Sequence, residues 1–248
     1  MRRNAGTSTW DMIQLTVAGD AEAAARTTAE RIAAAITEAR EQRGVAHVAL
    51  AGGRTPARAY RVLARAVERW DGVHVWLGDE RCVPPDDPDS NYRLLVETLL
   101  PGLREPPVVH LVEGAHRDPA GAADAYERAL RETVPGSPPV LDLALLGLGE
   151  DGHTASLFPN DPALDERERL CIAVHGTKPP FERVTLTLPV LRAARKVIVL
   201  AEGTGKAWAI TQMLAGPSPR IPASLLNDGH SEVEVIVDHE AAPSPTAS

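Results

Sequence analysis

The feature that most constrains this chain is an apolar run that ends in a glycine-rich turn. Residues 140–146 are predominantly apolar and are typical of a buried strand. The turn that follows carries three glycines, two acids and a histidine: Gly147, Gly149, Glu150, Asp151, Gly152 and His153. Ligands of open α/β sheets bind beyond the carboxyl ends of the strands. This turn is therefore the first candidate for a functional site.

Short apolar runs and longer amphipathic segments alternate along the rest of the chain. Strands are expected at residues 13–18, 47–51, 73–77, 108–112, 140–146, 171–174, 183–188, 196–200 and 233–237. Helices are expected at residues 21–44, 56–70, 91–100, 119–133 and 203–214. This alternation predicts an α/β fold with a mostly parallel sheet flanked by helices on both faces. We expect residues 11–240 to form a single domain, with flexible termini at 1–10 and 241–248.

Composition narrows the functional classes. The 248 residues carry a formal net charge of −8, which argues against nucleic acid as a partner and requires a local basic cluster for any anionic substrate. Two cysteines are too few for a disulfide framework or a zinc cage and favour the reducing cytoplasm. No apolar segment predicts a signal peptide or a membrane span. We expect a cytoplasmic monomer or small homo-oligomer.

The segment Gly52-Gly53-Arg54-Thr55-Pro56 follows a predicted strand and opens a predicted helix. Thr55 is a suitable N-cap and Pro56 suits the first helical position. Glycines permit a close approach to the backbone, and free N–H groups at a helix start favour an anion. The segment therefore predicts a phosphate site, although a plain turn with a surface arginine would have the same sequence. Lys206, in Gly203-Thr204-Gly205-Lys206, has a similar position, but neither segment is a complete P-loop.

A polar loop is expected at residues 78–89, followed by Ser90 as the N-cap of the next helix. Arg81 can clamp a phosphate or carboxylate, and Asp79 can orient a base or bind sugar hydroxyls. Arg183 lies at the entrance of a later strand and is a third candidate cation. The loop also fits a solvated acidic segment. Asp86, Asp87 and Asp89 lack the spacing of a calcium loop, and no residues have the ligand spacing of a zinc site.

His153 is the strongest candidate for acid/base chemistry. Among the eight histidines it alone lies in a glycine-rich turn after a strand and beside an acid, Asp151. The residues from Gly147 to Gly152 formally match G-x-G-x-x-G, but two carboxylates would face the pyrophosphate of a dinucleotide. Cys82 and Ser156 have no sequence context of a nucleophile.

Three motifs together resemble the 6-phosphogluconolactonase family: residues 51–56, residues 78–84 with Ser90-Asn91, and residues 147–159. Arg183-Val184-Thr185-Leu186-Thr187, Gly205-Lys206 and Pro222-Ala223-Ser224 fit the same pattern. The resemblance implies the fold of glucosamine-6-phosphate deaminase and ribose-5-phosphate isomerase, which is Rossmann-like. Arg54 departs from the family, which usually has serine there; the change adds charge and removes a hydroxyl contact.

The resemblance implies hydrolysis of 6-phospho-D-glucono-1,5-lactone to 6-phosphogluconate in the pentose phosphate pathway, without metal or cofactor. It makes His153 the catalytic acid/base, which Asp151 can orient, in a site that includes Gly152 and Asn91. Gly52, Gly53, Arg54 and Thr55 would anchor the 6-phosphate with help from Arg81, Arg183 or Lys206, and backbone N–H groups of the glycine turns are candidate oxyanion donors. Alternatives are an aldose–ketose isomerase or deaminase acting on an amino-sugar phosphate, and a non-catalytic sugar-phosphate sensor.

Overall fold

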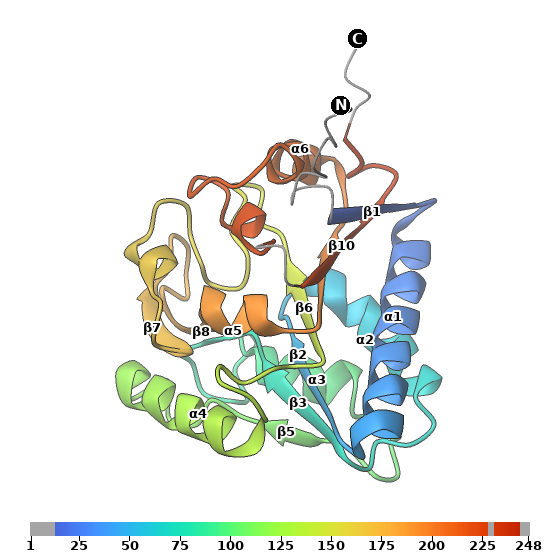
Figure 1. Ribbon diagram of the computed structural model, residues 1–248, viewed down its shortest axis with the longest axis vertical. Helices are drawn as coiled ribbons and strands as arrows, with labels where there is room; N and C mark the ends of the chain where they lie inside the picture. Colours follow the sequence, from blue (N-terminus) through green and yellow to red (C-terminus); the bar gives the residue numbers. More distant parts are fainter. Residues whose placement is uncertain (1–12, 228–230, 244–248) are drawn as a thin grey trace, which may run out of the picture.

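The computed structural model describes residues 13–227 and 231–243, in which strands and helices alternate (Figure 1). The strands are β1 (Ile13–Ala18), β2 (Ala46–Leu50), β3 (Val73–Leu77), β4 (Asp79–Arg81), β5 (Val108–His110), β6 (Leu143–Gly147), β7 (Cys171–His175), β8 (Glu182–Leu186), β9 (Lys196–Ala201) and β10 (Glu232–Asp238). The α-helices are α1 (Ala21–Arg43), α2 (Arg54–Ala66), α3 (Asn91–Thr98), α4 (Pro119–Thr133), α5 (Leu188–Ala193) and α6 (Ala207–Leu214). Short 3₁₀ turns are η1 (Pro162–Asp165), η2 (Thr204–Lys206) and η3 (Pro222–Leu225). Of the helices described, none has the length and apolar character that a bilayer span requires.

Seven strands form the main sheet in the order β1-β10-β9-β6-β2-β3-β5, and every neighbouring pair is parallel. The chain extends this sheet in two directions, through β3 and β5 on one side of β2 and through β6, β9 and β10 on the other. The strand order therefore reverses between β2 and β6, where open α/β sheets bind ligands. Pairing there is confined to Val48 with Leu143 and Ala49 with Ala144. The predicted mostly parallel sheet is confirmed.

A second, antiparallel sheet has the order β4-β8-β7. The prediction of a polar loop over residues 78–89 is wrong at its start, because β4 pairs with β8 through Asp79–Thr185, Glu80–Val184 and Arg81–Arg183. A three-residue strand of charged residues has no apolar periodicity by which the sequence could reveal it. Helix α5 also lies where no helix was predicted.

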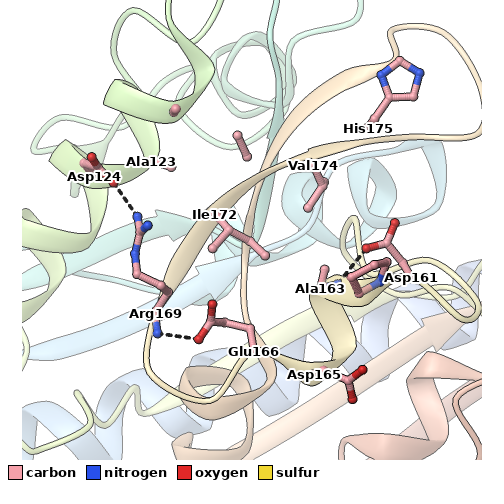
Figure 2. Close-up of a pocket in the computed structure, with 13 residues that line it drawn as sticks. Ala123, Asp124, Asp161, Ala163, Asp165, Glu166, Arg169, Ile172, Val174 and His175 are labelled. Carbon is pink, nitrogen blue, oxygen red and sulfur yellow. Dashed lines mark hydrogen bonds and ion pairs between the residues drawn. The ribbon is translucent and has the colours of Figure 1, made fainter.

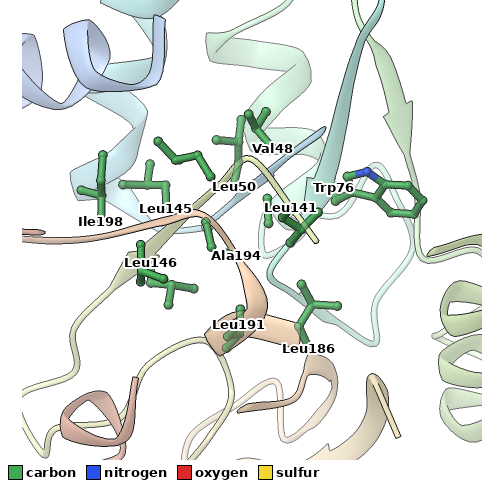
Figure 3. Close-up of a cluster of buried hydrophobic side chains, with 14 of the residues drawn as sticks. Val48, Leu50, Trp76, Leu141, Leu145, Leu146, Leu186, Leu191, Ala194 and Ile198 are labelled. Carbon is green, nitrogen blue, oxygen red and sulfur yellow. The ribbon is translucent and has the colours of Figure 1, made fainter. Parts of the chain in front are cut away.

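Buried side chains from both sheets belong to one core. Figure 3 shows Val48, Leu50, Leu145, Leu146 and Ile198 of the main sheet in a cluster that also contains Leu186 of β8 and Leu191 of α5. All of them are at most 2% exposed. Helices α1 and α2 pack against each other and against the main sheet, whereas α4 packs against β7 and β8 (Figure 1). The small sheet is therefore fixed in place by the same core.

Helix boundaries confirm Ser90 as an N-cap, correct Thr55, and show a further side-chain cap at Asp20. The Asp20 carboxylate accepts a hydrogen bond from Ala23 N, and Ser90 Oγ accepts one from Arg93 N. Thr55 is not the N-cap of α2; that position belongs to Gly53, whose φ of 103° strongly favours glycine, and the helix ends at Ala66 rather than at residue 70. Ala241, which we expected in a flexible tail, is fully buried. The expected tail at 1–10 lies outside the described residues.

Three imidazoles pack together near the start of β2 and β3. His47 is 3% exposed and accepts a hydrogen bond from Trp76 Nε1 at 3.5 Å. His110 stacks on the Trp76 ring with centroids 3.6 Å apart, and His74 Nδ1 lies 2.9 Å from His110 Nε2. Burial is the largest influence on both His47 and His110 and lowers their pKa values to about 4. The nearby Asp142 carboxylate offsets part of this effect at His47.

This cluster predicts how stability depends on pH. Because unfolding returns these imidazoles toward an ordinary pKa near 6.5, the unfolded chain binds more protons between about pH 6.5 and 4. The free energy of unfolding should be full above pH 6.5 and fall progressively below it. Urea titrations at pH 7.5, 6 and 5 should show a smaller loss for His47→Gln than for wild type. The exposed His239→Gln serves as the control, and an equal loss in all three proteins would contradict the prediction.

Candidate active site

A pocket of about 420 Å³ lies beyond the carboxyl ends of β2, β6 and β9, at the reversal of strand order. Most of the predicted site residues line it: Gly52, Gly53, Arg54, Thr55, Asp79, Arg81, His153, Arg183 and Lys206. Glu150 and Glu202 line it as well. Asn91 and Asp151 are not in its wall but contact Asp79 and His153, which are, and Gly152 directly precedes His153 in the chain. Four cations from separate parts of the sequence thus face the same volume as the histidine.

The turn after β6 holds His153 by backbone and side-chain hydrogen bonds. His153 Nδ1 lies 2.5 Å from Asp151 Oδ1, and the His153 carbonyl accepts a hydrogen bond from Gly149 N at 2.8 Å. A Cβ atom on Gly149 would lie 2.0 Å from His153 Nδ1, so this ring position requires glycine there. The contact with His153 is the largest influence on Asp151 and lowers its pKa to about 2. The ionised Asp151 carboxylate therefore accepts a hydrogen bond from the Nδ1–H group of His153, and Nε2 lies outside this contact.

The expected oxyanion donors need a correction in this turn. Gly149 N donates to the His153 carbonyl, and Gly152 N donates to the Gly149 carbonyl at 3.0 Å. Both N–H groups are thus already engaged in shaping the turn. Gly152 itself has a φ of 86°, and a Cβ atom there would lie 2.9 Å from Ile221 Cδ1, so its role is conformational.

Asn91 lies behind the loop of residues 52–56. A Cβ atom on Gly52 would lie 1.7 Å from Asn91 Oδ1, which shows that the amide occupies the space beside the glycine. Asn91 Nδ2 donates to the Asp79 carbonyl at 2.8 Å and to Asp79 Oδ1 at 3.2 Å. Asn91 is 2% exposed, so it acts by positioning the loop and Asp79. The sequence placed Asn91 among the binding residues without distinguishing this indirect role.

Glu80 fixes the start of α3 beneath the pocket. Its carboxylate accepts hydrogen bonds from Asn91 N at 2.7 Å and Tyr92 N at 2.9 Å, where the helix dipole favours negative charge. Burial raises the pKa of this carboxyl, and the backbone hydrogen bonds offset part of the rise.

The adjacent Arg81 donates through Nη1 to the Asp89 carbonyl at 2.6 Å. Its buried Nε has no hydrogen-bond partner among the described residues and is available to a ligand.

Asp79 and Arg183 meet at the floor of the pocket. Asp79 Oδ2 accepts a hydrogen bond from Ser156 Oγ at 2.6 Å and lies 3.9 Å from Arg183 Nη1. Ser156 is fully buried, so its hydroxyl orients Asp79 and is not a nucleophile. Sequence reasoning missed the hydrogen bond between Ser156 and Asp79 because the two residues are 77 positions apart.

Lys206 and Glu202, which both follow β9 in the chain, complete the pocket wall. Burial lowers the pKa of Lys206, whereas Glu150 and Asp151 partly offset the effect. The turn that carries Lys206 is held by Asp238, which accepts hydrogen bonds from Gly203 N at 3.0 and 3.2 Å. Glu202, which lies between β9 and this turn, was also missed. Its position directly after a buried strand, like that of Asp79 after β3, was the signal that could have found it.

The two cysteines are poor candidates for a nucleophile. Burial raises the pKa of the Cys82 thiol to about 11 and that of Cys171 further. Within residues 13–227 and 231–243, no group of His, Cys, Asp and Glu side chains has the geometry to hold a metal ion.

A larger hollow of about 660 Å³ lies between α4, η1 and β7 (Figure 2). Its acids have structural partners: Asp124 pairs with Arg169, Asp161 caps η1 through Ala163 N, and Glu166 accepts a hydrogen bond from Arg169 N. It does not contain the convergent cations and histidine of the first pocket.

Known proteins are similar to this chain over most of its length. The family described as glucosamine-6-phosphate isomerases/6-phosphogluconolactonase matches residues 19–235. The chain belongs to this family. A 6-phosphogluconolactonase of Streptomyces coelicolor is 40% identical over 220 residues, which are 83% of this chain and 84% of that protein. One of Synechocystis is 41% identical over 184 residues, 73% of this chain and 76% of that protein.

Solved structures of the family have the same fold. A 6-phosphogluconolactonase from Trypanosoma brucei superposes with a TM-score of 0.80 at 30% identity, covering 92% of this chain and 97% of that one. A monomeric glucosamine-6-phosphate deaminase superposes with a TM-score of 0.79, covering 92% of this chain and 98% of that one. It is 23% identical, and the likeness concerns the fold alone.

The packing at Gly52 predicts a steric limit. Gly52→Ala should displace the Asn91 amide and cost about 1–3 kcal/mol of unfolding free energy, as overpacking of a filled site does. The activity of any remaining folded protein should fall as well, because the same amide holds Asp79. Chemical denaturation compared with Gly19→Ala, where a Cβ would meet nothing within 4 Å, measures the effect. If both variants were as stable as wild type, the packing of the Asn91 amide against Gly52 would not contribute to stability.

Proposed function

We propose that this chain hydrolyses 6-phospho-D-glucono-1,5-lactone to 6-phosphogluconate, with His153 as the general base. The observation that carries the proposal is that His153, whose Nδ1 lies 2.5 Å from Asp151 Oδ1, lines a pocket that also contains Arg54, Arg81, Arg183 and Lys206. The pair supplies a proton acceptor, and the cations supply attraction for a phosphate. The names of the relatives support the same substrate.

A strained ester such as a δ-lactone does not require a covalent nucleophile. His153 Nε2 accepts a proton from water as the water oxygen attacks the lactone carbonyl carbon. The tetrahedral intermediate then expels the ring oxygen, which receives the proton from the imidazolium. Asp151 stabilises the positive charge on the His153 imidazolium during this cycle, since its pKa of about 2 keeps the Asp151 carboxylate ionised. Neither a metal ion nor a cofactor has a step in this reaction.

The phosphate of the substrate would lie at the start of α2. Gly53 opens the backbone there, and the helix N-terminus with Arg54 and Thr55 favours an anion. Arg81, Arg183 and Lys206 lie around the same pocket and would contact the rest of the phosphate or the sugar oxygens. We also propose that the protein acts in the cytoplasm, as a monomer or small homo-oligomer, and does not bind nucleic acid.

The base assignment predicts a loss of turnover. His153→Ala should lower kcat by roughly 10²-fold or more while KM changes little, because the variant lacks a proton acceptor for water. His153→Gln should be equally slow, since an amide hydrogen-bonds water but cannot take its proton. Stopped-flow assays of the lactone, corrected for spontaneous hydrolysis, give both constants. Near wild-type kcat in either variant would move the base to another residue.

The pH profile is a second readout of the same assignment. In the wild type, kcat should rise with pH, because a general base accepts a proton from water only in its unprotonated form. Because Asp151 titrates near 2, it contributes no ionisation to this limb at mildly acidic pH.

Ammonia release from glucosamine 6-phosphate, measured on the same preparation, distinguishes a deaminase. Release of ammonia without lactone turnover would overturn the proposed function.

The phosphate assignment predicts a loss of affinity. Arg54→Ala and Thr55→Ala should raise KM for the lactone several-fold with a smaller effect on kcat, because each removes an anion contact of the ground state. Arg61→Ala, an exposed position on the same helix that does not line the pocket, is the control. Unchanged KM in both pocket variants would show that the phosphate lies elsewhere.

A further inference from the structure

Glu202 places a carboxylate in a pocket whose four cationic side chains favour anionic ligands. Its side chain is 11% exposed and lies against the first turns of α2. Arg58 Nη1 of that helix lies 3.2 Å from Glu202 Oε2, and the Thr55 hydroxyl interacts with the same carboxylate. Glu202 is therefore beside the helix start at which the phosphate would bind.

One oxygen of this carboxylate has no donor. Glu202 Oε1 is buried and makes no hydrogen bond to any residue of the described ranges 13–227 and 231–243. Burial raises the pKa of the Glu202 carboxyl, and Arg58 offsets only part of that rise. A buried acceptor without a donor is costly, so a ligand that brings a donor to this oxygen gains affinity.

The other acids of the pocket are in different situations. Both oxygens of Asp79 accept hydrogen bonds, from Ser156 and from Asn91. Glu150 is exposed to solvent and lies near Lys206. Glu202 is thus the acid whose unmet acceptor lies at the phosphate loop.

Resting on the proposed function, we propose that Glu202 Oε1 accepts a hydrogen bond from a protonated phosphate oxygen. The site then selects phosphate groups that carry a proton and disfavours fully ionised oxyanions. A phosphate monoester carries this proton in its monoanion, which predominates below its second pKa near 6. Sulfate has the same shape but only acceptors at neutral pH, so it would set two negative oxygens against each other. The proton shared between phosphate and carboxylate remains with the ligand, and no covalent step is involved.

Direct binding of the two inorganic anions tests this selectivity independently of turnover. Titration calorimetry at pH 7 and constant ionic strength should give wild type at least about ten-fold tighter binding of phosphate than of sulfate, as expected when a buried acceptor rejects a ligand that lacks the donor. Glu202→Gln offers an amide donor and no charge, so sulfate should bind about as tightly as phosphate. Glu22→Gln is the matched control: Glu22 pairs with Arg58 Nε at 3.3 Å but is 64% exposed and does not line the pocket.

Lactone kinetics supply a second readout. In wild type, KM should rise between pH 5.5 and 7.5 as the substrate phosphate loses its last proton, and Glu202→Gln should flatten this rise. Equal binding of phosphate and sulfate by folded wild type would overturn the selectivity while leaving lactone hydrolysis intact. Absence of lactone turnover, with phosphate still preferred over sulfate, would instead overturn the proposed reaction. Binding of neither anion would overturn the phosphate subsite and the selectivity together.

Discussion

The buried amide of Asn91 holds three parts of the active site together. It fills the space beside Gly52, donates to Asp79 and stands at the first position of α3. The Glu80 carboxylate secures that position by accepting hydrogen bonds from the first N–H groups of the helix. Because the loop at the start of α2, β4 and α3 meet at one side chain, the distance between the backbone at Gly52 and Asp79 is set by packing in the interior.

The sequence predicted most of what lies directly after the strands of the main sheet. Gly52, Asp79, His153 and Lys206 were all identified because glycine-rich or charged segments followed apolar runs, and parallel strands bring their carboxyl ends to one edge. The pairing of Asp151 with His153 followed from their spacing and is present in the structure. These features are local, so a single sequence contains them.

What the sequence did not predict depends on contacts between distant segments. Strand β4 exists because β8 pairs with it, and Asp79 is oriented by Ser156, 77 residues away. The start of α2 was misplaced by two residues, because Thr55 matches the preference for an N-cap while the backbone conformation at Gly53 decides the boundary. Glu202 was not among the predicted site residues, because the contact that places it joins it to Arg58, 144 positions away in the sequence.

The local electrostatics oppose the overall charge. The chain is acidic, with a formal net charge of −8, yet four cations face the pocket. Several nearby carboxylates accept hydrogen bonds from protein groups: Asp151 from His153, Glu80 from the start of α3, and Asp238 from Gly203 N. Each of these carboxylates shapes the backbone or a side chain around the site. The pocket therefore remains attractive to an anion although acids surround it.

The two thiols have a consequence for how this protein can be studied. With a pKa of about 11, Cys82 exists as thiolate in only about one molecule in ten thousand at pH 7, and Cys171 is fully buried. Alkylating reagents attack thiolates, so both native cysteines should stay silent under mild labelling conditions. A single cysteine introduced at an exposed position would then be the reactive one. Spectroscopic probes can thus be attached to this chain without first removing its own cysteines.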